Sequence, residues 1–483
     1  MFEGTLYEFT CLPNGLSSGP RIFTKVMRAA LTHLRTENDV TISGYLDDNL
    51  LVNYDDVIQG FMKGKVAAEK FQKLGFAINI PKSVADAGVT KIEHLGVVID
   101  SVLMRATLSE KKTGKLVSAI QGCLDKPKIS IRELASVKGR IEATKPANPY
   151  APLWSKRLEI AKISALQSNS YNYEARIVLS QDCREDLMIA LQNLPGVSAP
   201  IRIPPPDYTI FSDASELGYG FHDPGADWRR QRGGGRWSQD EEGDHINVLE
   251  LKAAYFALKS LCDDKENIHL RMMTDNTTAM YCVNKLGSTR VKLNDLTHKI
   301  WLFAMERDIW LSSGYVPGRE NLISDEESRN FDENIEWTLR EDIFQYICQL
   351  FGTPNIDLFA SRLNFRVPKY VSWHPDPEAF SVDSFNCYWG SEFIYAFPPF
   401  CLVHKVIQKC IQDGAEGILI VPNWPSQPWF TLLHRFCVDK PFDFTVYNDE
   451  LFLPFRSDVQ VHPLSRQGQG LRMRAVSFKA NRI

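Results

Sequence analysis

The segment NIHLRMMTDNTTAMYCVNKL, residues 267–286, carries the strongest structural signal in the chain. Its first half alternates apolar and polar residues, as a half-buried strand does, and its second half has the spacing of a helix. Asp275 lies at the changeover between the two. A strand end is a position at which a fold can gather side chains from distant parts of the sequence, so Asp275 is a candidate site residue.

Three other acids lie in comparable positions on either side of this segment, each near the end of a predicted strand or on a helix. They are Asp213 in YTIFSDASELGYGF, Glu250 in INVLELKAAYFALKSL and Asp325 in VPGRENLISDEESR. Any one of them alone would more often be a helix cap or an ion-pair partner. Four carboxylates around one point, however, cannot all stay ionised without a cation. Two Mg²⁺ or Mn²⁺ ions held there could activate a water molecule and stabilise the leaving oxygen of a phosphodiester.

The blocks FSDAS, LELKA, TDNTTA and PGRENLISDEESR, in this order, resemble the ribonuclease H domain of retroelements. The resemblance implies an αβ sheet fold that cuts the RNA strand of an RNA–DNA hybrid, with the four acids as metal ligands. Many relatives carry a histidine in the loop before the last aspartate, whereas this loop reads SSGYVPG, with Tyr315 near that place. The Arg- and Gly-rich stretch at 229–236 predicts a mobile hairpin loop, and contact with a phosphate backbone is the alternative.

A second acidic feature is the segment TISGYLDDNLLV, residues 41–52, which places Asp47 and Asp48 between two apolar runs. Such a pair is common in a solvated turn. Adjacent carboxylates also repel each other, and a shared divalent cation relieves that repulsion. The pattern by itself therefore leaves both a turn and a metal site open.

Four blocks around this hairpin resemble retroelement reverse transcriptase: FTCLPNGLSSGPRIFTKVM, GYLDD, LGFAINIPKS and IEHLGVVID. In order they match a palm segment, the YxDD hairpin, a following turn and strand, and the palm-to-thumb hairpin. A YxDD motif alone is weak evidence, but four consecutive blocks are strong. The resemblance implies that Asp47 and Asp48 are metal-site residues, that Tyr45 belongs to the same polymerase hairpin, and that Lys82 lies near the incoming triphosphate.

Polymerisation needs a third metal-ligating aspartate on a strand before this hairpin. The upstream acids are Glu3, Glu8, Glu37 and Asp39, and none lies in a matching strand motif. The fingers, which cover the nucleotide in the family, have no counterpart either. We therefore expect that this chain does not polymerise. The alternative is a full transcriptase shortened only by gene prediction.

Residues 106–162 contain twelve Lys or Arg and five Asp or Glu, in a chain whose net charge is −4. One basic segment on an otherwise acidic chain indicates a phosphate-contact surface. A basic exposed helix face without a ligand is an equally good reading of the charge alone. By the same resemblance this stretch is the thumb and connection, which hold primer and template by their phosphates.

The C-terminal part has the segments TPNIDLFASRLNF, YAFPPF and GILIVPNWPSQPWF. Apolar strands that end in such loops predict a Rossmann-like sheet. The pattern resembles the C-terminal domain of DIRS-like retrotransposons, which is related to phage adenine-N6 methyltransferases. That implies S-adenosylmethionine near Asp357, Phe359 and Ala360, with a target base at Pro398 and Pro399.

A working methyltransferase of that family has a polar residue just before the two prolines, and here this residue is Phe397. Phe397 cannot accept a hydrogen bond from the adenine amino group, although Phe400 could stack on a flipped base. The departure favours a fold kept for packing or nucleic-acid contact over catalysis. Trp389, Trp424 and Trp429 are expected to fill the core more than to stack on bases.

Composition sets the remaining bounds. The 483 residues are 44% hydrophobic and 24% charged, as in an ordinary globular protein. The sequence contains no run of about 20 apolar residues, so it predicts no membrane span. The N-terminus has no secretory pattern. The ten cysteines form no CxxC pair, which fits reduced thiols. We expect a cytoplasmic or nuclear protein, not a secreted one.

Together these patterns predict a multidomain α/β and α+β chain of a DIRS-like element. The expected domains are a truncated palm at 1–105, a helical basic thumb or connection at 106–200, a ribonuclease H-like domain at 205–332 and a methyltransferase-like domain at 333–475. The expected partners are RNA–DNA hybrid and single-stranded RNA or DNA. The competing hypothesis is a catalytically silent nucleic-acid-binding remnant. The oligomeric state is not predicted.

Overall fold

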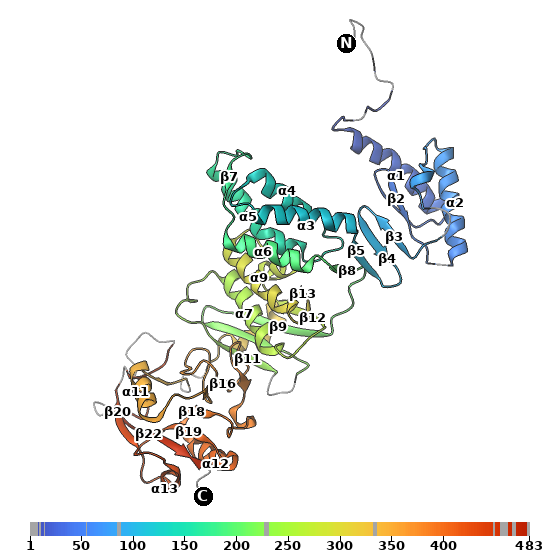
Figure 1. Cartoon of the computed structure of the whole chain (residues 1–483). Coiled ribbons are helices and arrows are strands. Elements are labelled where there is room, and N and C mark those ends of the chain that lie inside the picture. Colours follow the sequence, from blue (N-terminus) through green and yellow to red (C-terminus); the bar gives the residue numbers. More distant parts are fainter. Residues whose placement is uncertain are drawn as a thin grey trace. The chain divides into compact units, whose positions relative to one another are not determined.

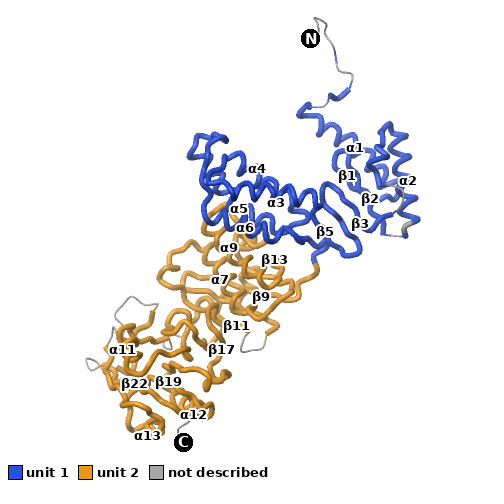
Figure 2. The backbone as a smooth tube through the Cα atoms, in the orientation of Figure 1, with its two compact units in different colours: residues 1–203 blue, residues 204–483 orange. Residues whose placement is uncertain are grey.

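The computed structural model has a mixed α/β architecture in two compact units, residues 1–203 and 204–483 (Figures 1 and 2). The residues that it describes are 8, 11–13, 15–54, 56–84, 88–226, 231–331, 336–447, 450–454, 462–465 and 470–480. The segment FEGTLYEF, which the sequence predicts to be a hairpin, lies outside these residues except for Glu8. The four domain boundaries inferred from the sequence stay predictions.

The N-terminal part of the first unit is a helix packed on the predicted YxDD hairpin. Its elements are α1 (Gly19–Glu37), β1 (Ile42–Tyr45), β2 (Asp48–Leu51), α2 (Val57–Lys73) and the 3₁₀ turn η1 (Ile80–Lys82). Helix α1 covers the segment PRIFTKVMRAALTHL, whose spacing of apolar residues predicts a helix. Gly44 lets the two elements approach, since a Cβ there would lie 2.6 Å from Leu31 Cδ1. The strand expected after α2 does not form: Phe76 and Ile78 instead pack against the core between α1 and α2.

The remainder of the first unit has a four-stranded antiparallel sheet in the order β3-β4-β5-β8 and a group of helices. The strands are β3 (Lys91–His94), β4 (Val97–Asp100), β5 (Arg105–Leu108) and β8 (Ser198–Pro200). The helices are α3 (Glu110–Leu124), α4 (Ile131–Glu142), α5 (Ala151–Ser168) and α6 (Gln181–Asn193), with the short pair β6 (Ile129–Ser130) and β7 (Arg176–Ile177). Helices α3 to α6 lie within residues 106–200, and the mostly helical character predicted for that range is confirmed.

The middle region, residues 204–331, is built on a five-stranded sheet in the order β11-β10-β9-β12-β13. The strands are β9 (Tyr208–Ala214), β10 (Gly218–His222), β11 (Arg232–Arg236), β12 (His269–Thr274) and β13 (Trp310–Tyr315). The helices are α7 (Ile246–Leu261), α8 (Thr277–Lys285), α9 (Val291–Met305), η2 (Gly318–Glu320) and α10 (Leu322–Glu327). The two strands around Asp213, the helix of Glu250 and the strand-to-helix change at Asp275 all form as predicted.

One local prediction for this region is wrong. Of the stretch 229–236, residues 232–236 are not a mobile loop but strand β11, paired antiparallel with β10, and residues 229 and 230 lie outside the described residues. The physical reason is crowding, because a Cβ at Gly234 would lie 2.5 Å from the carbonyl oxygen of Glu327 in α10. A Cβ at Gly220, in β10, would collide with the carbonyl oxygen of Ser324. These glycines provide a flat surface on which α10 packs, so their role here is close approach and not flexibility.

The C-terminal region, residues 336–480, has a five-stranded sheet in the order β15-β18-β19-β22-β20, in which β15, β18 and β19 are parallel. The sheet strands are β15 (Ile356–Asp357), β18 (Phe393–Ala396), β19 (Glu416–Pro422), β20 (Phe442–Val446) and β22 (Leu471–Lys479). The helices are α11 (Glu341–Phe351), η3 (Ser384–Asn386), η4 (Phe400–Leu402), α12 (Val403–Asp413) and α13 (Pro428–Phe436). Two small pairs complete it: β14 (Thr338–Leu339) with β21 (Leu451–Phe452), and β16 (Val371–Ser372) with β17 (Ser381–Val382).

The three tryptophans that were predicted to fill the core of this region do so. Trp389 and Trp429 are buried in one hydrophobic cluster, and the partly buried Trp424 packs against that cluster. No helix in the described part of the chain is both long and apolar enough to cross a membrane. All ten cysteines are free thiols.

Arg362 joins the C-terminal region to the middle region. Its Nη2 donates to the backbone oxygen of Arg236, at the end of β11, and to Glu241, both at 2.8 Å. The guanidinium also lies over the rings of Tyr219 and Phe256, 5.5 and 4.9 Å from their centroids. Because this side chain is only 9% exposed, the contact is a buried part of the second unit and not a surface ion pair.

Candidate functional site

Two predicted acids are brought together by strand pairing. Strands β9 and β12 are adjacent and parallel, and Met273 lies opposite Phe211. Two residues further along, Asp213 is still in β9 and Asp275 directly follows β12. Parallel strands end at the same edge of a sheet, so the two carboxylates meet there although 61 positions of sequence separate them.

The third acid, Glu250, comes from helix α7. It lies in the second turn of the helix and is 5% exposed. The backbone N–H of Ala214, next to Asp213, donates to its carboxylate. Its Oε2 atom has no hydrogen-bond partner within the described residues. One ligand oxygen each from Asp213, Glu250 and Asp275 lies within 4.8 Å of the other two.

Neighbouring polar groups hold these carboxylates in place. Ser328 Oγ lies 2.9 Å from Asp213 Oδ2. Asn276 caps α8 with its side-chain oxygen, and its Nδ2 donates to Asn247 in α7 at 2.9 Å. The end of β12 is therefore tied to the helix that carries Glu250. Gly318 leaves room beside the site, because a Cβ there would lie 3.0 Å from Asp275 Oδ2.

The cluster is electrostatically strained without a cation. Burial, together with the charges of Asp213 and Asp275, raises the pKa of Glu250 to about 9. Burial also raises the pKa of Asp213 to about 6, with further contributions from Asp275 and Asp325, against the lowering effect of the Ser328 hydrogen bond. The pKa of Asp275 is raised as well, chiefly by burial. Like charges that are kept out of water favour the protonated forms.

A divalent ion fits this set of donors. Carboxylate oxygens are the ligands that Mg²⁺ and Mn²⁺ prefer. The unpartnered Oε2 of Glu250 is a buried acceptor whose desolvation a cation would offset. Asp213, Glu250 and Asp275 would hold the ion. Within the described residues this is the only cluster of three or more potential metal-ligating side chains.

Asp325 is not part of the three-residue cluster. It lies on α10, and its Oδ1 accepts from Arg329 Nε at 2.7 Å. The packing of α10 on β10 and the Ser328 hydrogen bond place this helix against the site. The side chain of Asp325 is 43% exposed, whereas those of Asp213 and Glu250 are buried. The assignment of Asp325 as a metal ligand stays a prediction.

Asp47 and Asp48 lie at the tip of the β1–β2 hairpin and are exposed. Tyr45 pairs with Asp48 and is also exposed, and Leu46 adopts a left-handed turn conformation with φ 54°. Lys82 ends η1 and is exposed. Among the described residues no third carboxylate joins the two aspartates. The hairpin forms as predicted, and the assignment of these four residues to a polymerase site stays a prediction.

The residues predicted to bind S-adenosylmethionine lie at one edge of the C-terminal sheet. Asp357 ends β15, and Pro398 and Pro399 follow the adjacent parallel strand β18. Asp357 is buried and accepts from the backbone N–H groups of Phe359 and Arg366, at 3.3 and 3.1 Å. Both of its oxygens therefore order the loop that follows β15, while burial raises its pKa to about 7.

Packing also occupies the surroundings of this edge. Phe359 packs edge-on against Phe385, and the backbone N–H of Ala360 donates to Val371. The ring of Phe400 lies 5.4 Å from that of His462 and 5.7 Å from that of Trp424. These contacts give Asp357, Phe359, Ala360 and Phe400 structural roles, as the packing alternative expects. Binding of S-adenosylmethionine stays a prediction.

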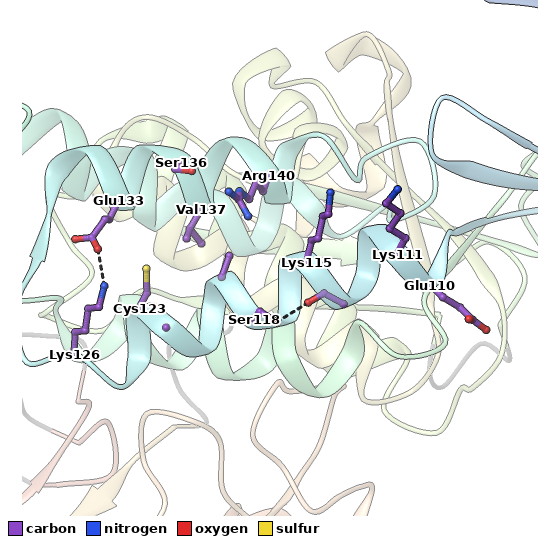
Figure 3. A pocket seen from close by; sticks show the side chains of 13 residues that line it. Glu110, Lys111, Lys115, Ser118, Cys123, Lys126, Glu133, Ser136, Val137 and Arg140 are labelled. Carbon is purple, nitrogen blue, oxygen red and sulfur yellow. Dashed lines mark hydrogen bonds and ion pairs between the residues drawn. The ribbon is translucent and has the colours of Figure 1, made fainter.

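A basic groove runs between α3 and α4 in the first unit, with a volume of about 680 Å³ (Figure 3). Lys111 and Lys115 extend from α3, and Arg140 lies on α4 (Figure 3). The described residues include no ion-pair partner for these three cations. Lys126, at the far end, is instead paired with Glu133 at 2.7 Å. Small residues on α3, such as Gly114 and Gly122, line the groove between the cations.

No protein-family model and no curated protein matches the sequence. Among solved structures, foamy viral protease-reverse transcriptase in complex with RNA/DNA hybrid is similar at 15% identity and a TM-score of 0.31, over 62% of this chain and 38% of that one. The same enzyme with double-stranded DNA gives 14% identity and a TM-score of 0.33, over 63% and 59%. RNase H1 from Halobacterium salinarum gives 16% identity and a TM-score of 0.21, over 25% of this chain and 96% of that one. This chain thus spans less than two thirds of the foamy viral chains.

Five residues at the middle-region site were not singled out from the sequence, among them Asn247 and Asn276. Ser328 and Arg329 stand in the quoted block SDEESR, and a serine and a cation three and four positions after Asp325 could have indicated that they face the same site. Gly318 stands in PGREN, where no local pattern indicates its close approach to Asp275. No local pattern marked Arg362, because its partners are distant in sequence.

Proposed function

We propose that this protein is a divalent-metal-dependent nuclease that hydrolyses the RNA strand of RNA–DNA hybrids, with its site in the middle region. The observation that carries the proposal is the convergence of Asp213, Glu250 and Asp275 to within 4.8 Å. Three carboxylates from a strand, a helix and a strand end, with raised pKa values and one unpartnered oxygen, form a site that a cation would stabilise.

In this proposal the three carboxylates bind the metal, and Asp325 adds a fourth oxygen donor from α10. Bound ions would activate a water molecule and stabilise the charge on the leaving oxygen. Ser328 orients Asp213 through its hydroxyl group. Asn276 and Asn247 hold the end of β12 against α7, which keeps Asp275 and Glu250 at a fixed separation.

The basic groove between α3 and α4 supports a nucleic-acid substrate. Its three cations would contact phosphates, which contribute affinity without sequence preference. We assign no polymerase chemistry to Asp47 and Asp48, because the described residues give them no third carboxylate. The choice of RNA over DNA as the strand that is cut rests on the resemblance of the four acid-bearing blocks.

The test is cleavage of a hybrid with a labelled RNA strand or a labelled DNA strand by the purified chain, with Mg²⁺, with Mn²⁺ and with chelator. Metal-dependent cutting of the RNA strand alone supports the proposal. Cutting of both strands would keep the metal site but change the substrate. A folded, monodisperse sample that binds hybrid without cutting would instead support the silent nucleic-acid-binding protein.

A further inference from the structure

The ion pair between Asp325 and Arg329 lies at the border of the carboxylate cluster. Arg329 Nε donates to Asp325 Oδ1 at 2.7 Å, and both side chains are about half exposed. The pair has the i, i+4 spacing of an ordinary helix-surface ion pair. Two features set it apart: its acid is the fourth candidate metal ligand, and Ser328, directly before Arg329, donates a hydrogen bond to Asp213.

The charge of Arg329 reaches beyond its partner. The hydrogen bond and charge of Asp325 raise the pKa of Arg329, and the charges of Asp213 and Asp275 add to that effect. In the other direction, Arg329 counteracts the burial that raises the pKa of Asp213 and of Asp275. The guanidinium thus lies in the field of three carboxylates, although it is hydrogen-bonded to only one.

The four acids differ in whether a cation is already bound to them. Asp213, Glu250 and Asp275 lie within 4.8 Å of one another, whereas Asp325 is held by an internal cation instead. A carboxylate near three others is stabilised by any positive charge that it can reach. A divalent ion and the guanidinium would therefore compete for the same oxygen.

We infer that Arg329 is the resting counter-cation of this site and competes with a divalent metal ion for Asp325. The inference rests on the proposed function and deepens it. When the ion binds through all four acids, Asp325 exchanges its bond with Arg329 for a bond with the metal. Arg329 therefore sets the metal concentration that the site requires, and it is a positioning residue, not a catalytic one.

Removal of the guanidinium charge should make metal binding tighter, whereas a purely structural role for Arg329 predicts no such gain. The readout is Mn²⁺ affinity, measured by titration calorimetry on the full chain without nucleic acid. We expect Arg329→Gln to tighten Mn²⁺ binding about fivefold, since a unit charge a few Å from a divalent ion is only partly screened near a protein surface. Asp325→Asn should weaken binding. In the Asp325→Asn background the gain from Arg329→Gln should shrink, because the competed ligand is gone.

Arg435→Gln is the matched control. It removes the same charge from an exposed position in the C-terminal region and should leave Mn²⁺ affinity unchanged. Unfolding by circular dichroism checks that every variant is folded at the assay temperature. Unchanged or weaker binding by Arg329→Gln would overturn the inference, as would an equal gain in Arg435→Gln, which would indicate a net-charge effect alone.

The outcomes separate this inference from the proposed function. A wild-type chain that binds no Mn²⁺ lacks the metal site, and both ideas fail together. If the wild-type chain binds Mn²⁺ and cuts hybrid, and Arg329→Gln binds Mn²⁺ with the same affinity, the proposed function stands. Only the competition between Arg329 and the metal ion is then refuted. Both ideas are supported if Arg329→Gln, and not Arg435→Gln, binds Mn²⁺ more tightly than the wild-type chain. Arg329→Gln should then also reach half-maximal cleavage at a lower metal concentration.

Discussion

At the scale of single residues, the middle-region site is a set of carboxylates kept where they repel one another. Asp213 and Glu250 are buried, and Ser328 and the Ala214 amide supply hydrogen bonds that offset only part of the cost. Buried acids with a structural role are satisfied by a cation, as Asp186 is by Arg157, or by backbone N–H groups at both oxygens, as Asp357 is. The absence of such a pair at Glu250 Oε2, among the described residues, is the reason to expect an ion there.

The Asp275→Asn substitution tests the metal assignment most directly. The amide keeps the shape of the side chain but removes one negative charge, so metal-dependent cleavage of hybrid should fall by at least about a hundredfold. The fold should remain, because an amide of the same shape fits the same space and relieves repulsion within the cluster. Asp308→Asn, the same change at an exposed position, serves as the control. Undiminished cleavage by Asp275→Asn would contradict the assignment.

The pH dependence of stability tests the electrostatic repulsion within the carboxylate cluster. The pKa of Glu250 is raised from 4.5 to about 9 in the folded chain, so the folded state binds more protons than the unfolded state within this window. The free energy of unfolding of the metal-free protein should therefore fall as pH rises from about 4.5 to about 9. The pKa of Asp213, raised from 3.8 to about 6, makes the free energy of unfolding fall in the same direction between these two pH values.

Thermal unfolding in chelator, followed across this pH range, measures the effect. Mg²⁺ or Mn²⁺ should flatten the profile, because a bound cation stabilises the ionised carboxylates. Glu250→Gln should flatten it without metal. A metal-free profile that is already flat in the wild-type chain would mean that the carboxylates are not strained.

At the scale of elements, the glycines of β10 and β11 are what allow α10 to lie on the sheet. Gly220 and Gly234 face the backbone of α10 so closely that a methyl group would displace the helix. Helix α10 carries Asp325, and Ser328, which follows it, reaches Asp213. The position of the fourth acid thus depends on residues that have no side chain of their own.

Gly220→Ala should therefore move α10 away from the site. We expect a loss of stability of about 2 kcal/mol, of the size typical for overpacking, and weaker Mn²⁺ binding because Asp325 is displaced. Gly139→Ala, in α4, is the matched control: nothing lies within 4 Å of its added Cβ, and a helical alanine should stabilise by about 0.5–1 kcal/mol. Chemical denaturation and calorimetry measure the two effects, and an unchanged Gly220→Ala protein would refute the close packing.

At the scale of the whole molecule, each compact unit contributes one part of the proposed function. The second unit joins the middle-region sheet to the C-terminal sheet through the guanidinium of Arg362. Glu241 receives Arg362 on one side and Lys252 of α7 on the other, so the connection continues to the helix that carries Glu250. This connection gives the C-terminal region a structural role that needs no bound cofactor.

Arg362→Ala should destabilise the second unit by about 3 kcal/mol, because it removes the strongest partner of Glu241, whose side chain is only 14% exposed. Arg362→Lys should restore only part of this, since an ammonium cannot make the same two hydrogen bonds in a planar geometry. Denaturant unfolding of the full chain gives the values, and the exposed Arg472→Ala provides the control. Equal stability of the Arg362→Ala and Arg472→Ala proteins would exclude the buried connection.

The basic groove belongs to the first unit and should contribute affinity for nucleic acid without catalysis. Changing Lys111, Lys115 and Arg140 to Gln should weaken binding of hybrid and reduce the salt dependence of log Kd by about 2–3, roughly one for each phosphate that is no longer neutralised. The matched control changes three other exposed lysines of the same unit to Gln: Lys25, Lys73 and Lys91. Equally weakened binding in the two triple variants would mean that net charge alone, and not the groove, holds the substrate.

Local sequence patterns determined most of the elements. Alternation and helical spacing predicted β9, β12 and α7 because each has one face buried and the other polar or part-exposed, which is a property of the local sequence. Asp275 was recognised because a strand-to-helix change is visible within a few residues. In the glycine-rich strand β11 the same reasoning failed, since glycine has no hydrophobic pattern and its reason for being there is a helix about 90 positions away.

Only the tertiary structure decided which acids meet. The parallel pairing of β9 with β12 brings Asp213 beside Asp275, and the packing of α7 adds Glu250. The sequence treated Asp325 as equal to these three, but the structure pairs it with Arg329. The physical reason is that residue type and periodicity are local, whereas the distance between charges, and the cation that each one takes, depend on how distant elements pack.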